Sequence, residues 1–192
     1  MRIFVAGATG VIGVRLVPLL VGAGHVVAGM TRSPDNVSAL RAQGAEPVVG
    51  DVFDLPALAR AVESFEPDAV VDQLTDLPDR LEELEAAAAA NDRMRTEGTR
   101  NLVEAAQATG ATHFVAQSIA WRPAGRAAAV DVHERQVLEI GGVVARYGRL
   151  HGPGTYYERE LPPPPRVHID AAVSATPPLL EAPSGIVTIV DR

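Results

Sequence analysis

Three glycines at three-residue spacing, Gly7, Gly10 and Gly13, lie between a short apolar run and a helical pattern near the start of the chain. A turn from a strand into a helix points backbone N–H groups and a helix N-terminus at one spot, which suits a pyrophosphate. Gly7 would allow the sharp turn, Gly10 a close approach to the phosphates, and Gly13 close packing of the helix on the sheet. The alternative is a glycine-rich turn that binds no ligand. The predicted cofactor-binding residues of this turn are Gly7, Thr9, Gly10, Val11, Ile12 and Gly13.

A second β-rich run, residues 26–31, ends in Arg32. Proteins that prefer NAD usually carry Asp or Glu at the end of this strand, where the carboxylate binds the ribose 2′-hydroxyl. This stretch has no acid, and a guanidinium can instead bind a 2′-phosphate through two hydrogen bonds. The competing interpretation of Arg32 is a solvated surface arginine. The sequence therefore predicts NADP as the cofactor, in preference to NAD.

Two histidines are candidates for proton transfer. His133 stands between Asp131 and Glu134 in its segment, and a neighbouring carboxylate can hold an imidazole as an acid or base near neutral pH. A solvated histidine on a helix surface is the alternative. His151 follows the last expected strand of the regular pattern, where a catalytic role and a structural one are equally open. No metal-ligand spacing is present, so no metal site is predicted.

The composition excludes several classes of function. The 192-residue chain is 47% hydrophobic, which is enough for one core, and it carries a net charge of −7 with a pI near 5.2. This balance argues against a nucleic-acid partner and a polybasic membrane patch. The absence of cysteine excludes a disulfide, a thiolate metal site and a thiol nucleophile. All 17 basic residues are arginine, so any mechanism that requires a lysine is excluded as well.

No apolar stretch is long enough to span a membrane, and the chain begins directly with an expected strand rather than a signal peptide. We therefore expect a soluble, cytoplasmic protein with a small-molecule substrate and no membrane partner.

The elements that must position these residues alternate along the chain. Apolar β-rich runs are separated by helical patterns, including an acidic, alanine-rich helix at 81–90, a long helix at 91–108 and a helix near 132–140. This rhythm predicts an α/β fold, a Rossmann-like doubly wound parallel sheet with helices on both faces. The expected strands are residues 3–6, 26–31, 46–49, 69–72, 113–117 and 143–146.

The regular pattern ends near Gly148. The run Leu161-Pro162-Pro163-Pro164-Pro165 cannot lie inside a helix or a central strand, so we expect an extended linker there. Short apolar runs at 167–169 and 186–190 are candidate edge strands. The predicted organisation is a dinucleotide-binding domain, residues 1–150, followed by a small, abridged C-terminal substrate region, residues 151–192.

Taken together, the segments of the chain resemble the extended or atypical short-chain dehydrogenase/reductase superfamily, the NAD(P)-dependent epimerase/dehydratase relatives. The resemblance covers roughly residues 1–155 and follows the order of the family's motifs. It depends on Gly7 to Gly13, Gly50-Asp51-Val52-Phe53-Asp54, Val70-Val71-Asp72-Gln73-Leu74, Gly98-Thr99-Arg100-Asn101-Leu102, Phe114-Val115-Ala116-Gln117-Ser118 and Arg146 to Gly154.

The resemblance implies roles for five further residues. Asp51 and Val52 would contact the adenine ring, and Gln73 and Leu74 would pass beside the cofactor's ribose and pyrophosphate. Ser118 occupies the position of the family's catalytic serine, at the carboxyl end of the fifth strand, where ligands collect in open α/β sheets. A strand-end hydroxyl that satisfies the backbone is the alternative for Ser118.

The chain departs from the family at its acid–base pair, a Tyr followed four residues later by a Lys and often, four residues further, by a Glu. If Glu134 is that Glu, Val130 takes the place of the Lys and Arg126 that of the Tyr. Only 15 residues separate Ser118 from Glu134, so the chain also looks abridged.

Three hypotheses of function follow. The first is an NAD(P)-binding, epimerase/dehydratase-like oxidoreductase acting on a small carbonyl or hydroxyl substrate, in which Ser118 polarises the oxygen and a non-standard acid replaces the tyrosine. The second is an NAD(P)-binding sensor or interaction protein without redox turnover. The third is a repurposed scaffold that catalyses a non-redox cyclisation, dehydration or isomerisation. A homodimer is a further expectation, because an abridged sheet would expose apolar edges.

Overall fold

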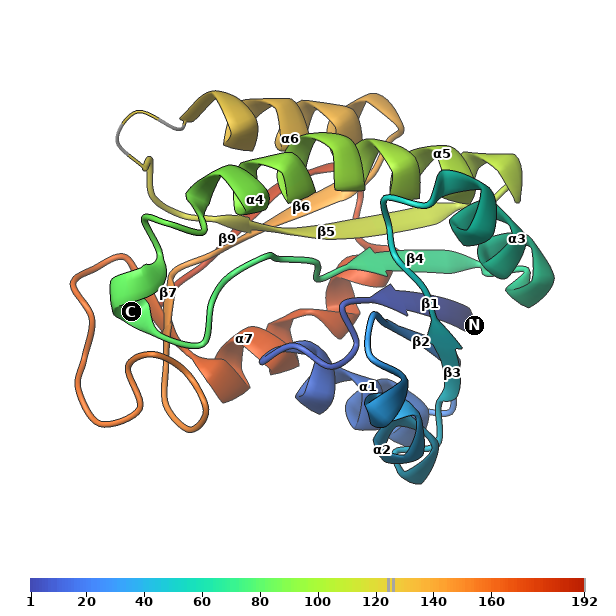
Figure 1. Cartoon of the computed structure of the whole chain (residues 1–192), viewed down its shortest axis with the longest axis horizontal. Coiled ribbons are helices and arrows are strands. Elements are labelled where there is room, and N and C mark those ends of the chain that lie inside the picture. The colour runs from blue at the N-terminus through green and yellow to red at the C-terminus, as the bar shows by residue number, and fades with distance from the viewer. Residues whose placement is uncertain (124, 126, 192) are drawn as a thin grey trace.

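The structure, a computed structural model, describes residues 1–123, 125 and 127–191. Its centre is a sheet of seven parallel strands in the order β3-β2-β1-β4-β5-β6-β9 (Figure 1). The strands are β1 (Arg2–Ala6), β2 (Val26–Thr31), β3 (Glu46–Val49), β4 (Ala69–Asp72), β5 (His113–Ile119), β6 (Val143–Tyr147) and β9 (Gly185–Ile189). All six strands expected in the regular pattern are present, and the Rossmann-like doubly wound fold is confirmed. Successive strands are added on one side of β1 up to β3 and on the other side from β4 onward. This switch point between β1 and β4 places a ligand crevice at their carboxyl ends.

Helices cover both faces of the sheet, as Figure 1 shows: α1, α2 and α7 lie on one face, and α3, α5 and α6 lie on the other. The helices are α1 (Gly13–Gly22), α2 (Val37–Ala42), α3 (Leu55–Phe65), α4 (Ala88–Arg93), α5 (Thr99–Ala108), α6 (Ala127–Glu139) and α7 (Ile169–Ala175). Short helical turns are η1 (Pro34–Asn36), η2 (Leu81–Glu83), η3 (Met94–Gly98) and η4 (Pro177–Glu181). None of the helices in the described part of the chain is long and apolar enough to cross a membrane.

The strands are apolar on both sides because helices bury both faces. In β1, Ile3 and Val5 belong to one core cluster, whereas Phe4 and Ala6 belong to the other. This alternation fixes the register of the strand, since a slip by one residue would exchange the two clusters.

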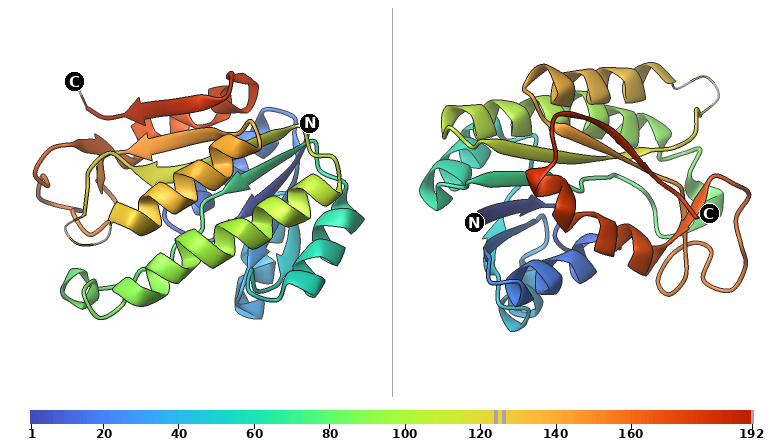
Figure 2. Two further views of the ribbon diagram at one scale, coloured as in Figure 1. Left: turned by 90° about the horizontal axis from the view of Figure 1, so that it is seen from above. Right: turned by 180° about the vertical axis from the view of Figure 1, so that it is seen from behind.

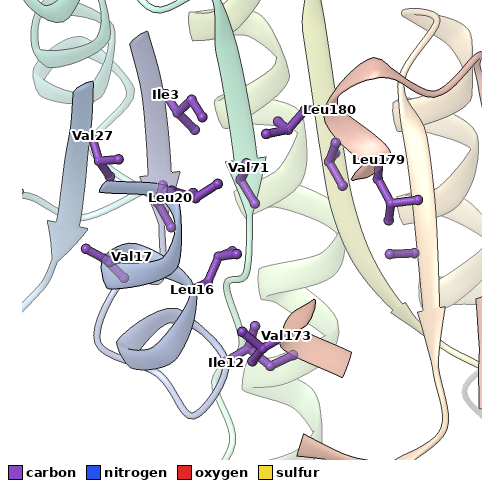
Figure 3. Close-up of a cluster of buried hydrophobic side chains, with 14 of the residues drawn as sticks. Ile3, Ile12, Leu16, Val17, Leu20, Val27, Val71, Val173, Leu179 and Leu180 are labelled. Carbon is purple, nitrogen blue, oxygen red and sulfur yellow. The ribbon is translucent and has the colours of Figure 1, made fainter. Parts of the chain in front are cut away.

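The first core cluster joins the two ends of the chain. Figure 3 shows Leu20 of α1 near Ile3 of β1, and Leu16, Leu179 and Leu180 belong to the same cluster. The C-terminal elements therefore pack on the sheet near the N-terminal helix, as the view from behind in Figure 2 also shows.

The prediction of a helix at 81–90 is wrong. Residues Leu81–Glu83 form only the 3-10 turn η2, and α4 begins at Ala88. Most residues of 81–90 are exposed or half-exposed, so no apolar stripe packs against the core to hold a helix. Residues 91–108 are helical as expected, but a π-helical turn, η3, lies between α4 and α5.

The C-terminal expectations are partly correct. The run 186–190 overlaps the edge strand β9, which pairs in parallel with β6. The run 167–169 is not at an edge of the main sheet. Residues Arg166–His168 form β8, which pairs with β7 (Arg149–His151) in a separate two-stranded sheet. The proline run between β7 and β8 lies outside helices and strands, as expected for an extended linker.

Candidate functional site

The glycine turn after β1 has the three features that its spacing predicts. Gly7 adopts a positive φ of 82°, and a Cβ there would lie 2.6 Å from the Gln73 carbonyl oxygen. A Cβ at Gly13 would lie 2.2 Å from the Gly7 oxygen, so only glycine fits where α1 packs against the turn. A Cβ at Gly10, in contrast, would meet no atom closer than the Gly7 oxygen at 3.5 Å. The space beside Gly10 is therefore open to a ligand.

The N-terminus of α1 has free donors at the same place. No side chain caps the helix, and the Gly10 amide donates to the Gly7 carbonyl at 3.1 Å. The amides of Val11, Ile12 and Gly13 donate to no acceptor among the described residues. Unpaired amides at a helix N-terminus bind anions, because the N–H groups and the helix dipole both favour negative charge. The turn thus fits the pyrophosphate of a dinucleotide.

A cavity of about 1060 Å³ runs along the carboxyl edge of the sheet. It brings together several residues that the sequence singled out, which come from the turn after β1, the loop after β4, β5 and α6. Those that line it are Thr9, Gly10, Val11, Leu74, Ser118 and His133. Arg32, Asp51, Val52 and His151 are not among its lining residues.

Arg32 lies at the tip of β2, half-exposed, with its Nη2 atom 2.9 Å from the Asp76 carboxylate. Asp76 belongs to the loop after β4, so an acid reaches this guanidinium from a distant segment although the end of β2 itself has none. A 2′-phosphate bound at Arg32 would share the guanidinium with Asp76 or displace it.

The turn after β3 is held by a hydrogen bond from α5. The Val52 side chain is buried, and its carbonyl accepts a hydrogen bond of 3.0 Å from the Asn101 side chain. Asp51 is exposed, and its carboxylate accepts the Phe53 amide at 2.9 Å. Asn101 was not selected from the sequence, although it stands in one of the resembling segments.

Gln73 and Leu74 form the exit of β4. The backbone amide of Gln73 donates to the Ala6 carbonyl at 2.9 Å, and the Leu74 carbonyl accepts from the Gln117 side chain at 3.0 Å. Both polar atoms of the Gln73 side chain are buried and make no hydrogen bond of normal geometry within the described residues. Burial raises the pKa of the Tyr147 hydroxyl. The side-chain amide of Gln73 lies close enough to that hydroxyl to oppose the rise slightly.

Ser118 is held by a buried carboxylate. Its hydroxyl donates to Glu134 Oε1 at 2.6 Å, and Arg146 binds both oxygens of the same carboxylate, with Nε 2.8 Å from Oε1. Burial raises the pKa of Glu134, but the hydrogen bonds from Arg146 and Ser118 and the charge of Arg146 outweigh it and leave that pKa below its ordinary value. Because an ionised carboxylate only accepts, the Ser118 proton points to Glu134 rather than into the cavity.

His133 is buried, with 3% of its surface exposed, so the alternative of a solvated helix histidine is wrong. Its sequence neighbours are not its partners, since Asp131 pairs with Arg122 and Glu134 with Arg146. The ring Nδ1 instead lies 2.7 Å from the Thr99 hydroxyl, which is 3.3 Å from the Asp72 carboxylate. The ring Nε2 lies 2.7 Å from the Gln117 carbonyl oxygen.

This chain of bonds contains one shared proton. The Gln117 carbonyl only accepts, so His133 Nε2 carries a proton. Thr99 has a single hydroxyl proton, which it can donate to Nδ1 or to Asp72, not to both. When Thr99 makes both bonds, the shared proton lies either on Nδ1 beside an ionised Asp72 or on Asp72 itself. Burial raises the pKa of the Asp72 carboxyl, and the charge of His133, the Leu74 amide and the Thr99 hydroxyl oppose this rise.

His151 lies away from these groups. Its Nε2 atom is 2.7 Å from Asp191, and its ring meets the His168 ring edge-on with centroids 5.2 Å apart. These contacts tie β7 and β8 to the C-terminal segment, which is a structural arrangement.

The position expected for the family's lysine is apolar. Val130 is buried in α6, with 2% of its surface exposed. Arg126, which would stand at the tyrosine position, lies outside the described residues.

Comparison with known proteins agrees with this geometry. Residues 7–139 match the protein family described as NAD(P)H-binding. The chain belongs to this family. Its resemblance to the extended, epimerase-like short-chain dehydrogenases/reductases is thereby confirmed, and so is NAD(P) binding at the level of the family.

Two curated relatives are similar in sequence. The 3-diazoavenalumate denitrifying reductase of a Streptomyces species is 42% identical over 186 residues, an alignment that covers 83% of this chain and 60% of the relative. An uncharacterized protein of Schizosaccharomyces pombe, C2A9.02, is 48% identical over 62 residues, covering 32% of this chain and 21% of that protein. The chain thus spans about 60% of the length of the reductase.

Two solved structures share the fold. The UDP-glucose 4-epimerase of Thermotoga maritima superposes with a TM-score of 0.81 at 17% identity, over 99% of this chain and 77% of the epimerase. The UDP-glucose 4-epimerase of Thermus thermophilus, in complex with NAD, gives a TM-score of 0.77 at 21% identity, over 99% and 78% of the two chains. At these identities the likeness concerns the fold alone.

Proposed function

We propose that the protein is an NADP(H)-preferring reductase that acts on a small molecule bound in the cavity beside Ser118 and His133. One observation carries the proposal: Thr9, Gly10 and Val11 of the glycine turn, the last with a free amide, line the same cavity as Thr99 and His133, which belong to a buried chain of hydrogen bonds. When bound there, the nicotinamide cofactor would exchange a hydride with the substrate.

Different residues of this chain would bind different parts of the cofactor. The amides of residues 11–13 would bind the pyrophosphate, with Thr9 and Gly10 beside it. Arg32 would bind the 2′-phosphate and exchange its bond with Asp76 for a bond to the phosphoryl group. Asp51 and Val52 would flank the adenine, and Gln73 and Leu74 the ribose and pyrophosphate.

The proton for a carbonyl substrate would come through Thr99. Both ring nitrogens of His133 are engaged, whereas Thr99 lines the cavity and also contacts Nδ1. The Thr99 hydroxyl would donate its proton to the substrate oxygen and take the Nδ1 proton of His133. The charged imidazole would end neutral, and the substrate would gain the O–H bond of the product.

Ser118 would have a different role from the one predicted. Because its proton is bound to Glu134, it meets a substrate as a hydrogen-bond acceptor. It would therefore orient a hydroxyl or amine group of the substrate rather than polarise a carbonyl.

The reductive direction follows the similarity to the denitrifying reductase, whose name records the removal of nitrogen from a diazo compound. A diazonium carbon that loses dinitrogen needs a hydride but no proton on an oxygen. Such a reaction places a smaller demand on an acid than carbonyl reduction does, and this site has no Tyr–Lys pair. Diazo compounds therefore belong in the substrate panel beside carbonyl compounds.

The test is cofactor binding followed by turnover. NADPH and NADH are titrated separately by calorimetry and fluorescence, and NADPH oxidation is then followed against carbonyl and diazo compounds. We expect NADPH to bind about tenfold or more tightly than NADH, and Arg32→Ala to remove that difference, since a charge-assisted bidentate contact is lost. Arg41→Ala, an exposed arginine of α2, is the matched control. Failure of both dinucleotides to bind would overturn the proposal.

A further inference from the structure

Arg95 is a half-buried cation with few bonds. It lies on the π-helical turn η3, and only 17% of its side chain is exposed. Its nearest carboxylate, Asp92, is 3.9 Å away, which is too far for a hydrogen bond. A guanidinium presents five N–H donors, and within the described part of the chain none of those of Arg95 has a hydrogen-bond acceptor.

Other arginines of the same region are better compensated and more exposed. Arg146 is 32% exposed and makes two hydrogen bonds to Glu134. Arg93, two residues before Arg95, is 54% exposed and makes two hydrogen bonds to Glu97. Burial lowers the pKa of Arg95, and the charges of Asp92 and Glu134 oppose this effect. Since an arginine stays charged at neutral pH, Arg95 is a cation that faces Asp92 at 3.9 Å and keeps N–H donors available to an anionic ligand.

The Arg95 side chain lines the cavity together with Thr99, Ser118 and His133. Gln136 of α6 donates to the carbonyl of Thr96, the residue after Arg95, at 3.1 Å, so this turn lies against the helix that carries the Ser118 partner Glu134. Glu134 itself is occupied by Ser118 and Arg146 and does not bond to Arg95. The helical stretch that carries Arg95 packs on α6, which holds His133 and Glu134.

Among the arginines that the described residues place around the cavity, Arg95 is the one that makes no hydrogen bond to the protein. The charged lining residues are four arginines and three acids, in a chain whose net charge is −7: Arg15, Arg80, Arg95, Arg149, Asp79, Glu82 and Asp92. Arg80 pairs with Glu82, Arg15 binds the Val11 and Pro153 carbonyls, and Arg149 binds carbonyls of the proline run.

We propose that Arg95 is the anchor of an oxyanion subsite, which binds a carboxylate or phosphate group of the substrate at the Ser118 end of the cavity. The planar guanidinium matches either group through two parallel hydrogen bonds. The identification of this group as part of the substrate rests on the proposed function, in which the cofactor occupies the glycine-turn end. A π-helical turn at this position is in keeping with a functional site, because such turns are frequent at sites of ligand binding.

The experiment uses benzoate and phenyl phosphate as anionic probes and benzamide as the neutral counterpart of benzoate. Binding is measured by NMR titration of the full chain, with and without NADP⁺. The variants are Arg95→Gln, Arg95→Lys and the control Arg93→Gln, which removes a neighbouring arginine that is paired with Glu97 and does not line the cavity.

We expect an anionic probe to bind the wild-type protein about tenfold or more tightly than benzamide, because a charge-assisted bidentate contact is involved. Arg95→Gln should lose that advantage, Arg95→Lys should keep part of it, and Arg93→Gln should keep all of it. Tighter binding of phenyl phosphate than of benzoate would identify a phosphate ester, and the reverse a carboxylic acid. Because Arg95→Gln removes a poorly compensated, half-buried charge, its Tm should stay equal to that of the wild type or rise.

Two results would overturn the subsite: binding of neither anion to the wild-type protein, or equal anion binding by the wild-type and Arg95→Gln proteins. Should Arg95→Gln fail to fold, Arg95→Lys decides by the same comparison. NADPH binding is measured on the same samples. If NADPH binds and the anions do not, the subsite fails while the proposed function stands. If Arg95-dependent anion binding occurs without any dinucleotide binding, the proposed function fails instead.

Discussion

At the scale of single residues, the site is defined by where protons and charges are held. Asp72, Thr99 and His133 come from β4, α5 and α6, and their hydrogen bonds contain one shared proton. The sequence selected His133, but with Asp131 and Glu134 as the expected carboxylates. Its actual counter-charge, Asp72, is 61 positions away in the chain, so no local pattern could have linked the two.

Asp72→Asn tests the shared proton. The asparagine can still accept the Leu74 amide and can donate to Thr99, which would then donate to His133 Nδ1. We expect Thr99 to donate to Nδ1 in the variant, so that ¹H–¹⁵N NMR of the imidazole shows Nδ1 as an acceptor and Nε2 as a donor. Asp131→Asn, which removes a carboxylate near His133 in sequence only, is the control. Identical ring spectra for Asp72→Asn and the wild type would show that the two groups share no proton.

Glu134→Gln tests the charge that holds Ser118. The pKa of Glu134 is lowered in the folded protein, so its contribution to stability is present above the ordinary value of 4.5 and is lost as the pH falls through the folded pKa. We expect the variant to be less stable by about 1–3 kcal/mol near neutral pH, because it weakens two bonds from Arg146. Urea unfolding at neutral and at acidic pH measures the difference, which should shrink at acidic pH. A constant difference at both pH values would contradict this account.

At the scale of elements, the glycine turn and α1 form one unit, in which cofactor binding and folding stability depend on different glycines. The turn could be predicted in full from sequence, because strand, glycine spacing and helix are adjacent in the chain. The helix expected at 81–90 could not, because alanine favours a helix only weakly when no apolar face is buried. A π-helical turn such as η3 has no sequence signal that we could use, and it carries Arg95.

Gly10→Ala should affect cofactor affinity, whereas Gly13→Ala should affect thermal stability. At Gly10 the new Cβ would make only an ordinary contact with the Gly7 oxygen at 3.5 Å, so we expect a Tm close to that of the wild type and a loss of NADPH affinity of about tenfold or more. At Gly13 the Cβ would collide with the Gly7 carbonyl, so we expect a lower Tm. Thermal unfolding and calorimetric titration of the two variants make the comparison. Undiminished NADPH binding by Gly10→Ala would show that the cofactor does not approach the backbone there.

At the scale of the whole molecule, the sheet ends in two open edges. β3 and β9 each pair with one neighbour, and Val49 and Ile186 on these edge strands are exposed. Unpaired edges with apolar side chains favour association of copies. The C-terminal segment returns to the first core cluster through Ile169, so residues far apart in sequence share one interior.

We therefore expect a homodimer, which stays a prediction from the exposed edge strands. Sedimentation equilibrium should give a particle of twice the 20.2 kDa chain mass. Ile186→Lys places a charge on the β9 edge and should shift the equilibrium toward the monomer, whereas a charge at the exposed Val14 of α1 should not. Particles of the single-chain mass at every concentration would contradict the expectation.

The sequence by itself determined the parallel sheet, the glycine turn and the absence of the family's lysine, because these depend on residue types and on spacings within one strand–turn–helix unit. Only the tertiary structure decided which charges meet. It buried His133 beside Asp72, bound Ser118 to Glu134, brought Asp76 to Arg32 and left Arg95 without a hydrogen-bond acceptor among the described residues. The physical reason is that burial and pairing of polar groups depend on contacts between elements distant in the chain, which local periodicity does not encode.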